Sequence, residues 1–177
     1  MTHRPLGRPL GRPLDRPLDR PRARLLPAAF LAAALLAGPA TAAPEGLVTA
    51  KTPHSYETLI ERLNVAVKAH EMGLVTRASA TVGAKAAFDK VIPGNMVIGV
   101  YHPRFAVPML EASIAAGIEA PIRFYITENE DGTASLTYRK PTVIFAPYEG
   151  GGEQLKNLAK ELDEVFASIA KQATAAE

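Results

Sequence analysis

The chain contains no cysteine among its 177 residues. Without a thiol it has no thiolate nucleophile, no cysteine-ligated zinc, no iron–sulfur cluster, no covalently attached c-type haem and no dithiol redox motif. Disulfide bonds are excluded as well, so a domain working in an oxidising compartment has to rely on its hydrophobic core. The absence of cysteine therefore removes several classes of site before any other motif is considered.

The signatures of common catalytic sites are also missing. The chain has no Gly-x-Ser-x-Gly nucleophile elbow, no His-Glu-x-x-His helix and no glycine-rich phosphate loop after a strand. The three glycines 150–152 precede a helix, but Glu149 and Glu153 flank them and would repel a phosphate. Dispersed histidines and carboxylates could still form an acid–base pair in the fold, so an uncharacterised hydrolase remains an alternative.

The longest apolar run is too short to cross a membrane. It covers residues 25–37 and contains Pro27, whereas a membrane-spanning helix needs about 20 apolar residues. Basic residues precede the run, and the small residues Ala40 and Ala42 follow it at the −3 and −1 positions of a cleavage site. This pattern is typical of a secretory signal peptide. We therefore expect cleavage near Ala42/Ala43, a periplasmic or secreted protein, and no stable membrane insertion after cleavage.

The leader also explains the basic character of the whole chain. Residues 4–21 repeat Arg-Pro-Leu-Gly/Asp, and this proline-rich repeat favours an extended chain. The segment either lengthens the basic beginning of the signal peptide or lies before a later translation start. Residues 1–42 contain seven arginines and two aspartates, and residues 43–177 contain 13 basic and 16 acidic side chains. The exported part thus has a net charge of −3. Without a lysine and arginine patch, nucleic acid is not an expected partner.

Residues 43–177 have the size of a single domain, and their hydrophobic periodicity predicts an α+β fold. Five strands alternate with helices in the order β-α-β-(α)-β-α-β-β-α, which predicts two layers: a mainly antiparallel or mixed sheet with helices on one face. The expected strands are 47–51, 74–78, 96–101, 122–127 and 133–138, with 143–145 as a further short strand. The expected helices run from an N-cap at Ser55 to a terminating Gly73, through one or two turns in 80–90, from Pro108 to Ala116, and from 153 onward.

The order of these motifs resembles the domain-of-unknown-function family 302. The resemblance extends over about residues 47–170 and includes Ser55-Tyr56-Glu57-Thr58, Pro93, His102-Pro103, Pro108-Met109-Leu110, Pro121, Asp131-Gly132, Tyr138 and Pro141. It implies a curved sheet carrying two helices, and a dimer. The family has no established activity, so the resemblance implies no chemistry.

Three departures from the family pattern alter polar positions. Ser79-Ala80-Thr81 stands where members usually carry a histidine, Val100-Tyr101-His102-Pro103 replaces Phe-Gly-Asn-Pro, and Val107 replaces a threonine. Polar positions that could have been taken for a site shared by the family are therefore altered in this chain.

The end of the central strand is the strongest candidate site. His102 follows a buried strand, and Tyr101, Met109 and Tyr138 complete the expected ligand-binding residues. Met96 lies on the same strand face as His102, so Met96, His102 and Met109 form a candidate soft-metal set for Cu(I), or axial ligands for haem. The alternative is that the methionines fill gaps in the core and His102 caps the strand end. His54 and His70 are roughly 24 Å apart on one helix and cannot share an ion.

The sequence thus predicts an exported, non-catalytic binding or interaction domain of unknown ligand, without a cofactor. The first alternative is a periplasmic protein that binds a soft metal or haem through His102 with Met96 and Met109. The second is the hydrolase. We also expect a homodimer, because the short strands leave at least one sheet edge unpaired.

Overall fold

The computed structural model describes residues 44–176, so the predicted leader, its repeat and its cleavage site lie outside the described residues. Five strands and five α-helices, with two short 3₁₀ helices, follow each other along this part of the chain. In order they are β1 (Leu47–Thr52), α1 (Tyr56–Ala69), β2 (Gly73–Ala78), α2 (Ala80–Phe88), β3 (Asn95–Tyr101), α3 (Pro103–Ala112), η1 (Ile114–Glu119), β4 (Ile122–Glu128), β5 (Ala134–Arg139), α4 (Pro141–Phe145), η2 (Glu149–Gly151) and α5 (Gly152–Thr174).

The strands form one sheet in the order β1-β5-β4-β3-β2, and every neighbouring pair is antiparallel. β1 and β2 are the edge strands. The turn between β4 and β5 is built as predicted, because Gly132 adopts a φ of 79° and the carboxylate of Asp131 accepts the Thr133 N–H at 3.0 Å. The α+β class is confirmed, and the sheet is antiparallel throughout.

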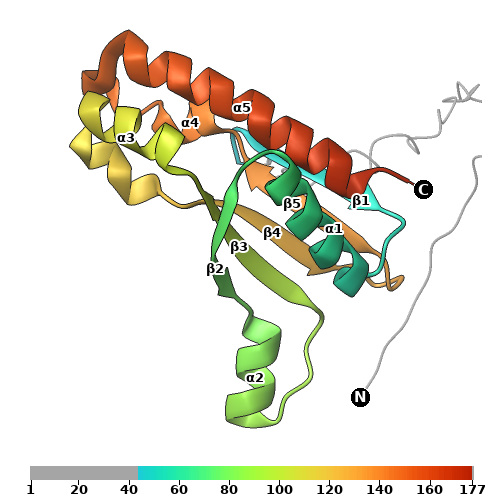
Figure 1. Ribbon diagram of the computed structural model, residues 1–177. Helices are drawn as coiled ribbons and strands as arrows, with labels where there is room; N and C mark the ends of the chain where they lie inside the picture. The colour runs from blue at the N-terminus through green and yellow to red at the C-terminus, as the bar shows by residue number, and fades with distance from the viewer. Residues whose placement is uncertain (1–43, 177) are drawn as a thin grey trace, which may run out of the picture. The chain divides into compact units, whose positions relative to one another are not determined.

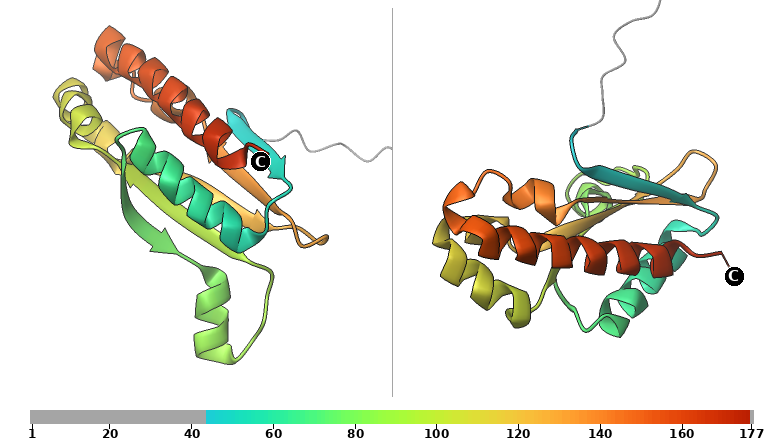
Figure 2. Two further views of the ribbon diagram at one scale, coloured as in Figure 1. Left: turned by 45° about the vertical axis from the view of Figure 1, so that its right-hand side comes forward. Right: turned by 90° about the horizontal axis from the view of Figure 1, so that it is seen from above.

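Helices α1, α3 and α5 cover one face of the sheet (Figures 1 and 2). Side chains alternate between the two faces, so Phe124 and Ile126 are fully buried while Tyr125 between them is 41% exposed. Phe124 stacks against Phe166 of α5 with 4.8 Å between ring centroids. The core therefore lies between the sheet and these helices. The opposite face, which carries Arg123, Tyr125 and Thr137, is called the open face below.

Of the two predicted ends of the first helix, the structure confirms one and contradicts the other. Ser55 is the N-cap of α1, as expected, and its hydroxyl accepts the Thr58 N–H at 3.2 Å. The predicted end at Gly73 is wrong, because α1 ends at Ala69 and Gly73 already belongs to β2. Glu71, rather than the glycine, takes the left-handed conformation that turns the chain, with a φ of 57°.

The helix predicted to begin at Pro108 begins five residues earlier. α3 starts at Pro103, and the predicted start, Pro108, lies inside it. Proline in the first turn has no N–H to leave unpaired, and the preceding His102 supplies the cap, so Pro103 is the stronger start signal. The helix ends at Ala112, and residues 114–119 continue as a 3₁₀ helix.

The short strand predicted at 143–145 is a helix, α4. Its N-terminus is capped from a distant part of the chain: Asp163 of α5 accepts the Thr142 N–H at 2.9 Å and the Thr142 hydroxyl at 2.7 Å. Residue 140 contributes no side-chain cap of its own. A tertiary contact therefore overrides the β-branched composition of this segment.

The helical turns predicted in 80–90 form α2, but in an unusual setting. Residues 79–94, called the arm below, run out from β2 and return to β3, and α2 lies beyond the ends of these strands, away from α1, α3 and α5 (Figures 1 and 2). α2 has no buried residue. The arm is therefore the one predicted helical segment that adds nothing to the core of residues 44–176.

Candidate functional site

His102 is the N-cap residue of α3. Its backbone is extended, with φ −149° and ψ 135°, and its carbonyl oxygen accepts the N–H groups of Phe105 and Ala106. The imidazole Nδ1 accepts the Arg104 N–H at 3.0 Å. His102 thus satisfies an N–H group that the first helical turn would leave unpaired, which is the role of serine or aspartate at other helix starts.

This capping bond fixes the protonation of the neutral ring. Because Nδ1 accepts a hydrogen bond it has no proton, and the proton of the neutral imidazole is on Nε2. A protonated Nε2 has no lone pair for a metal ion. Metal-ligating histidines instead donate a hydrogen bond from the ring nitrogen that does not bind the metal. Capping α3 and ligating a metal through Nε2 are therefore competing roles for His102.

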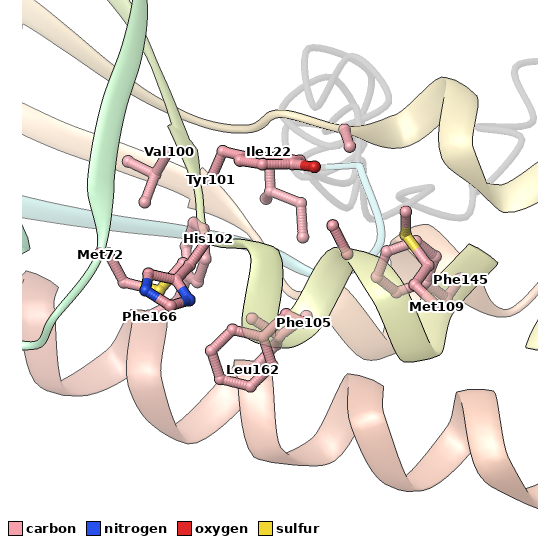
Figure 3. A pocket seen from close by; sticks show the side chains of 12 residues that line it. Met72, Val100, Tyr101, His102, Phe105, Met109, Ile122, Phe145, Leu162 and Phe166 are labelled. Carbon is pink, nitrogen blue, oxygen red and sulfur yellow. The ribbon is translucent and has the colours of Figure 1, made fainter. Parts of the chain in front are cut away.

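A small pocket lies where β3 enters α3 (Figure 3). Its wall includes Tyr101, His102 and Met109 from the predicted site, together with Met72 and Phe105. Water-sized molecules can occupy a volume of about 30 Å³ there, which corresponds to one or two waters. Haem and most organic ligands require several hundred Å³, so this pocket has room for water and not for haem.

The predicted site residues do not come together as one ligand set. Figure 3 shows Met109 beside Phe145, at the other end of the pocket from His102. Met96 is six residues before His102 in β3, a separation of about 20 Å at 3.3 Å per residue, and is not on the pocket wall. The predicted soft-metal set of Met96, His102 and Met109 is therefore spread over the strand and the helix.

Tyr138 is not on this pocket's wall, although its ring contacts Phe166, which is. Its ring lies in the core, 5.4 Å from the Phe124 centroid and 6.0 Å from that of Phe166. Burial raises the pKa of its hydroxyl, and the nearby Asp163 carboxylate adds to this. Tyr138 thus has the surroundings of a core aromatic.

Met72 is one of the pocket residues that sequence reasoning missed. It lies between α1 and β2, and Figure 3 shows its side chain next to the His102 ring. The antiparallel register pairs Gly73 with Tyr101, so Met72 is placed opposite His102. Only the pairing of β2 with β3 could have revealed this proximity, because the residues are 30 positions apart in the sequence.

Two charged residues that neighbour the pocket residues in sequence, Glu71 and Arg104, pair with each other. The Arg104 guanidinium is 3.5 Å from the Glu71 carboxylate and 4.6 Å above the Phe105 ring. Among residues 44–176, no three histidine, aspartate or glutamate side chains gather closely enough to hold a metal ion. The pocket therefore offers a thioether and an imidazole without a third strong ligand.

A second candidate site lies at the base of the arm. Asn95 Oδ1 accepts the Ala80 N–H at 2.9 Å, while the Thr81 hydroxyl donates to Pro93 O at 2.9 Å and accepts the Asn95 N–H at 3.0 Å. Glu128 joins from β4 by accepting the Gly94 N–H at 2.7 Å. These hydrogen bonds join the two ends of the arm to each other and to the sheet.

Tyr56 lies beside this network. Its ring packs against Gly94 so closely that a Cβ on that residue would come within 2.8 Å of the ring. The hydroxyl is buried and makes no well-formed hydrogen bond within the described residues. Burial raises the pKa of Tyr56, and the neighbouring Ser79 hydroxyl opposes this with a smaller effect.

The arm itself is apolar. α2 reads Ala-Thr-Val-Gly-Ala-Lys-Ala-Ala-Phe, with a single charge. Val82, Phe88 and Val91 are 66%, 79% and 82% exposed. A helix that is mostly apolar is normally buried, so this exposure is unusual; Ile114 and Ile118 of η1, at 84% and 80%, are exposed to a similar degree.

A hollow of about 560 Å³ opens next to the base of the arm. The register places Ala78 of β2, Val97 of β3 and Tyr125 of β4 side by side in three neighbouring strands, on the open face. Ser79, Ala80 and Asn95 complete the wall. The arm-base hollow, as it is called below, thus combines an apolar floor with a few polar groups.

Comparison with known proteins gives a family and a fold. The family described as "Domain of unknown function DUF302" matches residues 48–173. A solved structure of an uncharacterized conserved DUF302 protein from Bacillus stearothermophilus superposes with a TM-score of 0.66 at 19% identity, covering 73% of this chain and 98% of that one. At this identity the structure shows a shared fold and no shared activity.

Relatives with a named function are similar over a shorter segment. The "Fluoride-specific ion channel FluC 1" of Brucella suis biovar 1 is 30% identical over 96 residues, which is 54% of this chain and 37% of that protein. The "Fluoride-specific ion channel FluC 2" of Brucella melitensis biotype 1 is 30% identical over a similar segment, 35% of its length. The chain thus matches little more than a third of these relatives. None of the helices described here has the length and apolarity needed to cross a membrane.

Proposed function

Because the chain belongs to the DUF302 family, whose description assigns no activity, we propose that it acts as an exported, non-catalytic interaction domain that forms homodimers through the arm. The observation that carries this proposal is the exposure of α2, an almost uncharged helix without a single buried residue. Apolar surface held in water is unfavourable, and burying a side chain such as Phe88 contributes about 1.5–3 kcal/mol. Extended apolar surfaces of this kind mark interaction sites.

The attachment of both ends of the arm to the sheet supports the same function. A loosely attached apolar segment would fold back onto its own domain, but both ends of the arm are fixed by Asn95, Thr81 and Glu128. An element held outward in this way loses little conformational freedom when a partner binds. The arm therefore has the properties of a preformed contact element.

Sedimentation of residues 43–177 over a range of concentrations tests the proposal. We expect a dimer, and we expect Phe88→Asp and Val82→Asp to raise its dissociation constant at least tenfold, because a charge would enter the interface. Val65→Asp is the matched control, since Val65 is 62% exposed on the surface of α1. A wild-type protein that is monomeric at every concentration, or an equal effect of Val65→Asp and Val82→Asp, would contradict the proposal.

A membrane channel is the second candidate partner, favoured by the similarity to the fluoride-specific channel proteins. In those relatives a segment similar to this domain belongs to the same chain as the channel. Residues 43–177 would then bind a channel from outside the membrane. Co-purification of residues 43–177 with the Brucella suis protein lacking its matched segment tests channel binding. Binding that Phe88→Asp abolishes would support a channel partner. If the two proteins do not bind, the homodimer remains the proposal.

A further inference from the structure

We propose that a pocket between α4 and the first turns of α5 binds a small organic acid, through an ammonium group at its rim and an apolar floor. The pocket lies away from the arm and has no part in the proposed dimer, so this inference stands independently of it. Its wall has two parts: a buried floor of Phe145, Leu155 and Ala159, and an exposed rim with Glu149, Lys156 and Lys160.

The pocket has the dimensions of a small-molecule site. Water-sized molecules can occupy about 450 Å³ of it, and pockets for small ligands span roughly 300–1,000 Å³. α4 packs against the first half of α5 (Figures 1 and 2), and residues 148–149 between the two helices contribute to the wall. The pocket is therefore partly enclosed, in contrast to the arm-base hollow, which is more open.

The floor of the pocket is apolar and fixed by packing. Phe145 is 4% exposed, and Leu155 and Ala159 are each 2% exposed. Leu155 and Ala159 are four residues apart in α5, so they lie on the same side of the helix, the side that borders the pocket. A hydrocarbon or aromatic group can be buried against this floor without moving it, and a preformed surface of this kind favours binding.

Lys160 supplies an unpaired cation at the rim. Its neighbour Lys156 donates to the Glu153 carboxylate at 2.8 Å. Lys160 lies one turn further along α5, and its ammonium group makes no ion pair or hydrogen bond within residues 44–176. An ammonium group has three donors and no acceptor, so a carboxylate from outside the chain can supply the missing acceptor.

The charges at the rim favour a ligand with one negative charge. Two lysines and one glutamate, Lys156, Lys160 and Glu149, give the wall a net charge of +1. Glu149 lies near Lys156, and Glu153 lies near both lysines. These carboxylates would repel the second charge of a phosphate group. A monocarboxylate with an aromatic or aliphatic body therefore matches both the rim and the floor.

Titration of residues 43–177 with phenylacetate, an aromatic carboxylate, and octanoate, an aliphatic one, tests the proposal by nuclear magnetic resonance. We expect saturable changes in the amide resonances of the pocket residues. Lys160→Gln should raise the dissociation constant at least fivefold, because the carboxylate loses its cationic partner. Lys171→Gln is the matched control and should change the constant less than twofold, since Lys171 is an exposed lysine of the same helix, about 16 Å beyond Lys160.

Two further measurements check the charge of the ligand and its location. Phenylacetamide has the shape of phenylacetate without its charge and should bind at least fivefold more weakly. Ala146 is an exposed residue of the pocket wall with helical backbone angles, so a large side chain is compatible with its backbone. Ala146→Trp should therefore fill the pocket and abolish binding.

Saturable binding of a carboxylate that Lys160→Gln weakens and Ala146→Trp abolishes supports the pocket. No saturable binding of either carboxylate by the wild type overturns it. Equal affinities for phenylacetate and phenylacetamide, equal effects of Lys160→Gln and Lys171→Gln, or unchanged binding in Ala146→Trp overturn it as well. Sedimentation without ligand tests the dimer separately, so the two proposals can fail independently. Far-ultraviolet circular dichroism of each variant confirms that it is folded.

Discussion

The imidazole of His102 lies at the junction of β3 and α3, next to the edge strand β2; the central strand of the sheet is β4, not β3 as the sequence suggested. Its Nδ1 accepts the Arg104 N–H at 3.0 Å, so the ring acts as a helix cap. Nearby Met72 and Met109 have the burial of core residues, at 6% and 4% exposure. His102 and Met109, two of the three residues predicted as a soft-metal set, therefore have structural contacts that explain their positions.

Replacing His102 distinguishes the capping role from metal binding. We expect His102→Ala to lower the free energy of unfolding by about 0.5–2 kcal/mol, because the Arg104 N–H loses its acceptor. His102→Asn restores an acceptor and should recover most of this loss. Urea denaturation of the three proteins measures the difference. Tight Cu(I) binding by the wild type that His102→Ala abolishes without loss of stability would contradict the capping role.

At the scale of elements, the long helix α5 is held near both ends by hydrogen bonds to distant parts of the chain. Near its start, Gln154 donates to Pro108 O of α3 at 3.3 Å. At its C-terminus, Arg62 of α1 donates from Nε to Ala173 O at 2.9 Å and from Nη2 to Ala175 O at 2.7 Å. His54 adds a bond from Nε2 to the same Ala175 oxygen at 2.8 Å. The last carbonyl groups of a helix otherwise have no partner.

Removing the arginine should loosen this end of α5. We expect Arg62→Ala to lower the free energy of unfolding by about 1.5–3 kcal/mol, since a charged donor to helix carbonyls is lost, and to increase amide exchange in the last turn. Lys68→Ala, on the same helix, is the control and should change stability by less than about 0.5 kcal/mol. Hydrogen exchange and thermal unfolding provide the measurements. Equal amide exchange in the Arg62→Ala and Lys68→Ala variants would contradict the role of Arg62 in holding this end of α5.

At the scale of the whole molecule, one face of the sheet is covered and the other is open. The helices over one face bury the core, while the open face and the arm remain available for contacts. The family match over residues 48–173 includes all of these parts. Their arrangement favours an interaction domain, and the signal peptide predicted in residues 1–42 favours an exported one.

The proposed export makes a direct prediction about the N-terminus of the working protein. The Ala40-Thr41-Ala42 site predicts that the exported chain begins at Ala43. Mass spectrometry of protein recovered from the periplasm or the medium should give the mass of residues 43–177. An intact leader on most of the material would contradict cleavage and indicate a membrane anchor instead.

The periodicity of hydrophobic residues was sufficient to predict most of the helices and strands. The five strands and the long helices follow from alternating or 3.6-residue patterns, which reflect burial of one face. It was not sufficient where a distant residue decides the local structure. α4 forms because Asp163 caps it, and α3 begins at Pro103 because His102 supplies a side-chain acceptor, neither of which a hydrophobic pattern records.

The sequence by itself determined the fold class, the absence of thiol chemistry and the resemblance to the family, because composition and periodicity are local properties of the chain. Only the tertiary structure decided that Met72, and not Met96, lies beside His102, because strand register brings together residues that are distant in sequence. It also decided that α2 stays outside the core. An apolar helix predicts burial, and whether its own domain or a partner covers it depends on where β2 and β3 direct the chain.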